Sequence, residues 1–331
     1  MTTRANSPLP TTVGVAVRLR GHATTGDLRD MGCSDADLRR WRRSGELVAL
    51  RRGVFALGST WRAAPPWERQ RIRALAVYDQ VGRGRALSHH SALAVHRVQV
   101  FGVDERVHFV PDPAEPPARK RERRAAPTVS LHPGVPAELL VTWGERRTVT
   151  VAAAVAQVAA SFGAEAGLVS ADSALNLGRM SRGDLRSAID TLRLRVGRRT
   201  AELVAKLADG RSESSGETRV RWLLHQCGIG DVEPQAAIIG DDGRAFARVD
   251  LLVDGVLVVE YDGESKYGAA DSADFAVLKK EKRREDRIRR AGFDVERVVA
   301  ADLWEPAALA RRLATALATA RERYGPVRGP G

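Results

Sequence analysis

Residues 248–267 read Arg-Val-Asp-Leu-Leu-Val-Asp-Gly-Val-Leu-Val-Val-Glu-Tyr-Asp-Gly-Glu-Ser-Lys-Tyr, and this stretch decides the fold of the C-terminal part of the chain. Two apolar runs flank Asp254-Gly255, a dipeptide typical of tight turns between antiparallel strands, so the stretch predicts a β-hairpin. Three carboxylates, Asp250, Glu260 and Asp262, interrupt the apolar runs. Since acids are scarce in central strands, we expect the chemistry of this region to lie there.

The length of the turn decides whether the three carboxylates share a face of the sheet. A two-residue loop would pair Asp250 with Val259 and send Glu260 and Asp262 to the opposite face. A three-residue loop with Gly255 in the left-handed conformation puts all three on one face, and we expect this arrangement. Crowded carboxylates repel one another unless a cation holds them, and oxygen ligands suit Mg²⁺ or Mn²⁺. The alternative is a set of solvated acids near a sheet edge.

Composition and charge narrow the class of protein. The chain has 331 residues and a formal net charge of +12, which favours a polyanionic partner such as nucleic acid. Part of this excess of arginine can equally reflect a GC-rich coding bias. Two distant cysteines, Cys33 and Cys227, predict no disulfide framework and fit a reducing, cytoplasmic location. No signal peptide is evident, and the most apolar run, 149–162, is too short to span a membrane.

The first 60 residues predict a small winged helix-turn-helix domain. A helix ending near Met31 is followed by a second helix over 35–44, and residues 47–57 then form a hairpin that turns at 51–53. Basic side chains gather on the second helix and on the hairpin tip, and these are the predicted DNA contacts: Arg39, Arg40, Arg42, Arg43, Arg51 and Arg52. A helical bundle with a solvated arginine face is the alternative.

Four short segments also carry a family resemblance. Residues 25–28, 41–48 and 51–55 resemble the N-terminal winged helix of AbiEi-type antitoxins, and residues 88–96 resemble the segment that follows it in those proteins. The resemblance implies binding to an operator DNA. A cognate toxin is the protein partner that the resemblance implies.

Residues 61–200 predict a mainly helical connector domain. Proline residues at 65–66 and Ser88 open two helices, residues 101–111 form a strand and loop, and residues 148–194 form a helical bundle. His89, His90 and His96 lie close in sequence, but adjacent histidines on a helix face apart, so a metal site is disfavoured there. The Pro-rich basic segment 113–124 is predicted to be a solvated loop.

Residues 201–331 form the third predicted domain. An amphipathic helix over 212–228 turns Glu217 toward the sheet, where it either caps the helix with Ser214 or completes the acidic site. A long basic helix over 272–291 follows the hairpin; Lys282 and Glu285 share its inward face, and Lys279, Arg283 and Arg287 are expected to contact DNA.

This order of elements resembles the PD-(D/E)XK nuclease fold, in the branch related to very-short-patch repair endonuclease. The resemblance rests on Val249-Asp250, Glu260-Tyr-Asp262-Gly263, 281–287 and 292–297. It implies that Asp250 and Glu260 hold magnesium, with Asp262 or Glu217 completing or orienting the site. Asp262 stands where the parent motif has lysine, so Lys266 or Lys282 has to substitute.

The sequence therefore predicts a multi-domain α/β (α+β) protein that binds DNA. Its function is expected to be that of a Mg²⁺-dependent DNA endonuclease, with catalytic candidates Glu217, Asp250, Glu260, Asp262, Lys266 and Lys282. The alternative is a transcriptional regulator or antitoxin with a non-catalytic nuclease fold. RNA remains open as a substrate.

Overall fold

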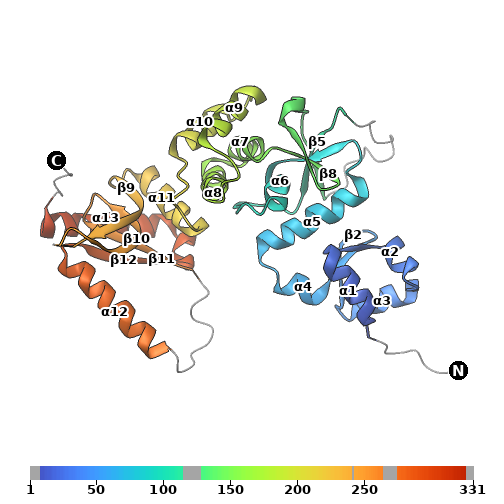
Figure 1. Ribbon diagram of the computed structural model, residues 1–331, viewed down its shortest axis with the longest axis horizontal. Coiled ribbons are helices and arrows are strands. Elements are labelled where there is room, and N and C mark those ends of the chain that lie inside the picture. The colour runs from blue at the N-terminus through green and yellow to red at the C-terminus, as the bar shows by residue number, and fades with distance from the viewer. Residues whose placement is uncertain (1–7, 115–127, 241, 264–273, 326–331) are drawn as a thin grey trace. The chain divides into compact units, whose positions relative to one another are not determined.

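The computed structural model describes residues 8–114, 128–240, 242–263 and 274–325, with the side chains of 274–278 left out (Figure 1). The chain divides into two compact units. One contains residues 1–170 and 180–205, and the other contains residues 171–179 and 206–331. The mixed α/β class predicted from the sequence is confirmed. None of the helices in the described ranges is long and apolar enough to cross a membrane.

The first unit begins with a winged helix. Its elements are α1 (Thr11–Arg20), β1 (Ala23–Thr24), α2 (Thr25–Asp30), α3 (Asp35–Arg43), β2 (Leu47–Arg51) and β3 (Val54–Leu57). The strands form an antiparallel sheet in the order β1-β3-β2. The sequence predicted α2, α3 and the hairpin, whereas α1 was not foreseen. Val13 and Val17 of α1 join the core of this domain.

Local hydrogen bonds explain where α3 begins. The N–H of Asp37 donates to Ser34 Oγ (3.2 Å), and the N–H of Ser34 donates to Asp37 Oδ2 (3.0 Å), which together form a capping box. Leu38 and Trp41 face the core and are buried. The pairing between β2 and β3 keeps the wing attached to that same core.

The rest of the first unit differs from the expected helical connector, because it also carries a five-stranded sheet. Its strands are β4 (Arg85–Leu87), β5 (Val107–Pro111), β6 (Val129–Leu131), β7 (Leu140–Trp143) and β8 (Arg146–Val149), in the order β6-β5-β4-β8-β7. Each strand has only three to five residues, too few for a clear period-two pattern.

Two helices contact β5 of this sheet, and further helices complete this part of the chain. They are α4 (Gly58–Ala63), α5 (Pro66–Val81), α6 (His89–Val95), the 3₁₀ turn Ala137–Leu139, α7 (Val151–Phe162), α8 (Ala164–Asn176), α9 (Arg182–Leu192) and α10 (Arg198–Leu207). The predicted start of a helix at Pro66 is confirmed. The range 148–194 is mainly helical as predicted, but residues 148–149 belong to β8.

The second unit is a four-stranded mixed sheet between helices. It contains α11 (Ser215–Cys227), β9 (Val232–Ile239), β10 (Ala245–Val253), β11 (Leu257–Asp262), α12 (Asp274–Arg290), β12 (Asp294–Val299), the 3₁₀ turn Ala300–Trp304 and α13 (Pro306–Tyr324). The strand order is β12-β11-β10-β9, with β11 and β12 parallel and the other pairs antiparallel.

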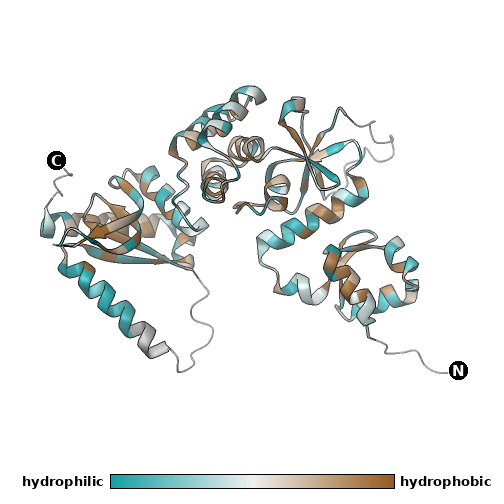
Figure 2. Ribbon diagram, in the orientation of Figure 1, coloured by the Kyte–Doolittle hydropathy of each residue, from teal (hydrophilic) through white to brown (hydrophobic). Residues whose placement is uncertain are grey.

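Two apolar clusters hold this sheet. One joins Leu251, Leu257 and Val259 to α11 and α13, and the other joins Val258 and Val295 to Ile288 of α12. Figure 2 shows the contrast between the apolar strands and the hydrophilic α12. The sheet is therefore covered on both faces, as the apolar run in β11 predicted.

The hairpin has the register that the sequence analysis favoured. Leu251 pairs with Val259 and Val253 with Leu257, which leaves a three-residue loop at 254–256 and places Asp250 opposite Glu260. Gly255 has φ 67° and so adopts the left-handed conformation. The expected turn is thus confirmed.

Candidate nucleic-acid interface and acidic site

The first candidate site is the exposed face of α3. Arg39, Arg42 and Arg43 are exposed, while the apolar residues between them anchor the helix. Arg40 is different: its Nη2 donates to Asp37 Oδ1 at 2.7 Å and its guanidinium lies 5.6 Å from the ring centre of Trp41. Three of the four predicted arginines are therefore free to meet phosphate, and Arg40 braces the helix.

The wing tip exposes only one of the two arginines predicted there to contact DNA. Arg52 is exposed, but Arg51 is half-buried and burial lowers the pKa of its guanidinium. Backbone contacts fix the tip, since Gly53 C=O accepts the N–H of Thr25 (2.9 Å) and Arg52 C=O accepts Gln80 Nε2 (3.2 Å). Helix α3 and Arg52 thus lie in the same compact unit.

The second candidate site lies on the hairpin of the second unit, where Asp250 opposes Glu260. The backbone N–H of Tyr261 donates to Asp250 Oδ2 at 2.8 Å. This carboxylate therefore accepts a backbone hydrogen bond of the kind that a carbonyl of the neighbouring strand usually accepts. Gln235 Nε2 lies 3.5 Å from the other oxygen, Asp250 Oδ1. Gln235 has φ 54° within β9, a strained conformation for a residue other than glycine.

Glu217 joins this site from α11. Its side chain is buried, and Glu217 Oε2 accepts the N–H of Glu213 (3.0 Å) and Gln235 Nε2 (2.8 Å). The N–H of Glu217 donates to Ser214 Oγ (3.1 Å), so the predicted capping role belongs to Ser214. The carboxylate itself is linked through Gln235 to Asp250. The capping alternative for this segment is therefore confirmed, and the role of Glu217 in a metal site stays a prediction. We call the side of the hairpin that carries Asp250, Glu260 and Asp262 the acidic face.

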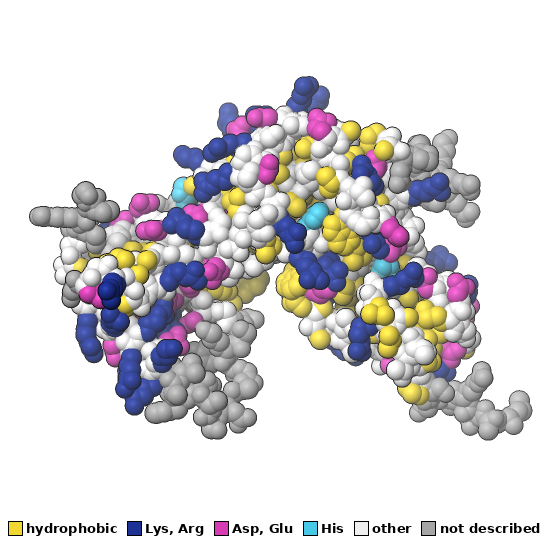
Figure 3. Space-filling model, in the orientation of Figure 1, with side chains coloured by type: hydrophobic (Ala, Val, Ile, Leu, Met, Phe, Trp, Pro, Cys, Tyr) yellow, Lys and Arg dark blue, Asp and Glu magenta, His cyan; other side chains and the backbone are white. Residues whose placement is uncertain are grey.

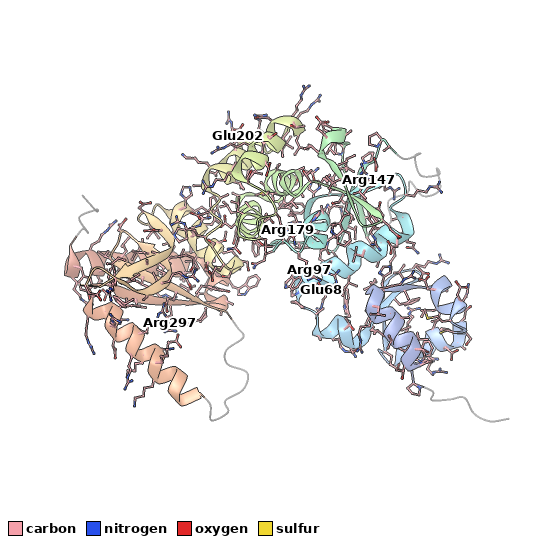
Figure 4. All side chains as sticks on the ribbon, in the orientation of Figure 1. Glu68, Arg97, Arg147, Arg179, Glu202 and Arg297 are labelled. Atoms are coloured by element: carbon pink, nitrogen blue, oxygen red, sulfur yellow. The ribbon has the colours of Figure 1, made fainter. Side chains whose placement is uncertain are left out.

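Two arginines form ion pairs with Glu260 and Asp262, and neither was a predicted site residue. Arg284 Nη2 lies 2.9 Å from Glu260 Oε1, and Arg297 Nη1 lies 2.9 Å from Asp262 Oδ2. Arg297 also contacts Glu281 and Glu285 of α12 at 3.3 Å, so it links the sheet to the helix (Figure 4). Both arginines lay within predicted elements, but only the folded register brings them to the acids.

Burial changes the electrostatics of the site. It raises the pKa of Glu260, an effect that the nearby Arg284 and Arg297 oppose and that the charge of Asp250 reinforces. Burial likewise raises the pKa of Glu217, against the hydrogen bonds from Glu213 and Gln235. Two carboxyls of this cluster therefore resist ionisation more than free glutamate does.

Only one of the two lysines expected to complete the site lies within the described residues, and it lies elsewhere. Lys282 is exposed, so its predicted inward position is wrong. Glu285 does face the sheet as predicted, and Glu281 and Arg284 face it as well, because Arg297 and Glu260 offer them ion-pair partners. Lys266 lies outside the described residues. The other catalytic candidates, Glu217, Asp250, Glu260 and Asp262, lie on or beside the hairpin as expected.

The outer face of α12 is strongly basic. Figure 3 shows lysine and arginine side chains over this helix, and its exposed cations are Lys279, Lys280, Lys282, Arg283, Arg287, Arg289 and Arg290. The guanidinium of Arg287 lies 4.1 Å from the ring centre of Phe246. The predicted DNA contacts Lys279, Arg283 and Arg287 are all accessible, which is the property that phosphate binding requires.

The acidic face fits a divalent cation only in part. Asp250 and Glu260 offer oxygen ligands from opposed positions, which suits Mg²⁺. Asp262 faces Arg297 instead. Within the described ranges, these three carboxylates do not form a group with all ligand atoms inside 4.8 Å of one another. A metal at this face would have to compete with Arg284 for Glu260.

We expect Glu217→Gln to stabilise the second unit at pH 7 by about 1 kcal/mol, because it removes a desolvated charge while keeping an oxygen acceptor. Burial raises the pKa of Glu217 in the folded state above its ordinary value of 4.5. The stability that protonated Glu217 contributes is therefore complete below pH 4.5 and is lost as pH rises through the folded-state pKa. Pulse proteolysis in urea measures this change in stability. The gain should vanish below pH 4.5, and the exposed-site control Glu233→Gln should show none. An equal gain at both pH values would contradict the assignment.

Comparison with known proteins bears on the first candidate site. Residues 15–58 match the family described as transcriptional regulator, AbiEi antitoxin. Two Mycobacterium tuberculosis proteins, Uncharacterized protein MT2308 (strain CDC 1551 / Oshkosh) and Uncharacterized protein Rv2248 (strain ATCC 25618 / H37Rv), are each 29% identical over 283 residues, or 84% of this chain and 95% of theirs. The crystal structure of RV2827C protein from M. tuberculosis covers 65% of this chain and 82% of its own, with 19% identity and a TM-score of 0.34.

The family match spans the winged helix and confirms the AbiEi resemblance there. It supports a DNA-binding regulator or antitoxin domain at the N-terminus. The matched residues end before the acidic site, so the resemblance of residues 210–325 to nucleases stays a prediction.

Proposed function

We propose that this protein is a transcriptional regulator that binds an operator through α3 and the wing. The observation that carries the proposal is the exposure of Arg39, Arg42 and Arg43 on a capped helix, inside a segment that matches AbiEi antitoxin regulators. In winged helix-turn-helix proteins the second helix enters the major groove and the wing follows the backbone. A cognate toxin, which the family match suggests, is part of this proposal.

The proposal is tested by selection of bound duplexes from fragmented genomic DNA and a random library. We expect the full chain to enrich a defined sequence, and the variant Arg39→Ala/Arg42→Ala/Arg43→Ala to enrich none. The core residues of α3 are untouched in this variant, so its circular dichroism spectrum should match the wild type. Failure of the wild type to enrich any sequence would contradict an operator-binding role.

A second function is favoured by the opposed carboxylates of the hairpin. We propose that Asp250 and Glu260 hold Mg²⁺ and that this face hydrolyses phosphodiester bonds in DNA. Bound there, Mg²⁺ would supply Lewis-acid activation of water and would offset negative charge on the phosphate. Among the protein groups, Glu217 would orient Gln235 and Asp250 through its hydrogen bond, and Arg284 would transfer from Glu260 to the phosphate.

Nicking of supercoiled plasmid in the presence of Mg²⁺ or Mn²⁺ tests this second function. We expect Asp250→Asn and Glu260→Gln each to reduce the rate at least 100-fold, while the surface control Glu233→Gln leaves it unchanged. Absence of cleavage by wild-type protein that still binds its operator would leave the regulator proposal standing and remove the nuclease.

A further inference from the structure

Three histidines far apart in sequence meet in the first unit. His89 begins α6, His108 lies in β5, and His132 directly follows β6. One ring nitrogen of each lies within 4.8 Å of one from each of the others. The winged helix and the acidic hairpin use none of these residues, so the cluster requires its own explanation.

The three rings lie in contact with one another. His108 Nδ1 lies 2.8 Å from His132 Nε2, and the ring of His89 stacks on that of His132 with 3.8 Å between centroids. A tetrahedral ion with metal–nitrogen distances of about 2.0–2.1 Å separates its ligand atoms by about 3.3 Å. An ion therefore requires a small opening of the His108–His132 contact and an adjustment of the His89 nitrogen, which lies within 4.8 Å of the other two.

A carboxylate orients one of these rings. Asp104 Oδ1 lies 2.8 Å from His108 Nε2, which directs the opposite nitrogen, Nδ1, toward His132. Carboxylate partners on the outer nitrogen are usual for metal-ligating histidines, because they fix the tautomer and raise ligand basicity. The ring of His108 is 1% exposed, so it cannot easily rotate away from this arrangement.

The backbone at His89 is strained. His89 has φ 50° at the first position of α6, and its N–H donates to Gln157 Oε1 (3.3 Å). Strained backbone of this kind persists where the surroundings fix it, and it is frequent in ligand sites. Burial lowers the pKa of His89 to about 2, and the neighbouring histidines add to this effect. Burial also lowers the pKa of His132 to about 4, an effect that His108 reinforces and Asp104 opposes. Neutral imidazoles of this kind are ready to act as ligands.

A cavity of about 580 Å³ adjoins the cluster. Its lining includes His89, His132, Gln157, Ser161, Arg193 and Arg195. A set of three protein ligands leaves one position of a tetrahedral ion open, and open positions distinguish reactive from purely structural zinc sites. The cavity gives that fourth position access to water or to a small anion, which the two arginines would attract.

We propose that His89, His108 and His132 form a binding site for a divalent transition-metal ion of the zinc class, with its fourth position facing the cavity. The nitrogen-only ligand set favours zinc, cobalt or nickel over magnesium. The site is separate from the proposed Mg²⁺ site on the hairpin, which offers only oxygen ligands.

The probe is the metal alone, added to tag-free full-length protein after dialysis against a chelator. We expect one equivalent of Zn²⁺ by mass spectrometry, and Co²⁺ should give visible bands typical of tetrahedral coordination. His132→Gln should abolish stoichiometric binding, and Asp104→Asn should weaken it about 10–100-fold without removing a ligand. His225→Ala, which removes an exposed histidine of the second unit, should bind like the wild type.

Less than a tenth of an equivalent of Zn²⁺ on folded wild-type protein, with no visible Co²⁺ bands, would overturn the proposal. Undiminished stoichiometry in both His132→Gln and Asp104→Asn would overturn it as well, since the ion would then lie elsewhere. Because Asp104→Asn keeps all three histidines, a fold defect in one histidine variant cannot imitate the full pattern.

Discussion

Replacing Arg221 with methionine is expected to destabilise the second unit by about 3–5 kcal/mol, the usual range when one partner of a buried ion pair is removed. Arg221 Nη2 lies 2.7 Å from Asp172 Oδ2, and Asp172 is 1% exposed. Asp172 also accepts the hydroxyl of Thr218 (2.8 Å) and the N–H of Asp209 (2.8 Å). The substitution therefore leaves a buried carboxylate without its counter-charge, at the point where α8 meets α11.

Hydrogen exchange of amides in α11 and β10 measures this loss for the second unit by itself. Burial already raises the pKa of Asp172 in the wild type, so the loss in the variant should shrink at acid pH as this carboxyl protonates. Arg248→Met is the matched control, because Arg248 pairs with Glu213 on the surface at 2.7 Å and such pairs contribute at most about 1 kcal/mol. Equal losses in the two variants would contradict the account.

Gly58→Ala should destabilise the winged helix by about 3 kcal/mol and displace α3. An added Cβ at Gly58 would lie 1.8 Å from Gly45 C=O, and the N–H of Gly58 donates to the neighbouring Glu46 C=O at 2.7 Å. The obstacle is backbone, so relief requires a shift of the chain, and overpacking of this kind costs about 1–3 kcal/mol or more. Gly45 directly follows the end of α3, so operator affinity should fall as well.

Gly183→Ala provides the matched control in the same unit. Its Cβ would have only Ser181 Oγ within 4 Å, at 3.5 Å, and its position near the start of α9 favours alanine. We expect this variant to be as stable as the wild type or more so, with unchanged DNA binding, as measured by urea unfolding and fluorescence anisotropy. A Gly58→Ala protein that unfolds at the wild-type urea concentration would show that the Gly45–Gly58 approach is not tight.

Local signals explain the parts of the fold that the sequence predicted. The Asp254-Gly255 turn fixed the hairpin register, and with it the opposition of Asp250 and Glu260. Ser34 with Asp37 marked the start of α3, because both halves of a capping box are readable at a spacing of three residues. Each of these features depends on neighbours in sequence.

Features that depend on distant partners were missed. Lys282 was expected to point inward because it shares a helical face with Ile288, but the ion pairs of Arg284 and Arg297 decide the orientation of α12. The five-stranded sheet was missed because its strands are short and pair across long intervals. The histidine cluster was likewise hidden, since His89 was weighed only against its near neighbours His90 and His96. Its actual companions follow 19 and 43 residues later, at His108 and His132.

The most direct test of the central claim is the salt dependence of operator affinity for the full chain, measured by fluorescence anisotropy. The account predicts that Arg39→Ala/Arg42→Ala/Arg43→Ala weakens binding and reduces the slope of log K against log salt by about 3, at about 0.9 for each lost phosphate contact. The control Arg182→Ala/Arg186→Ala/Arg199→Ala removes the same charge from exposed positions elsewhere and should keep the wild-type slope. If both variants reduce the slope equally, or neither does, α3 is not the DNA-binding surface.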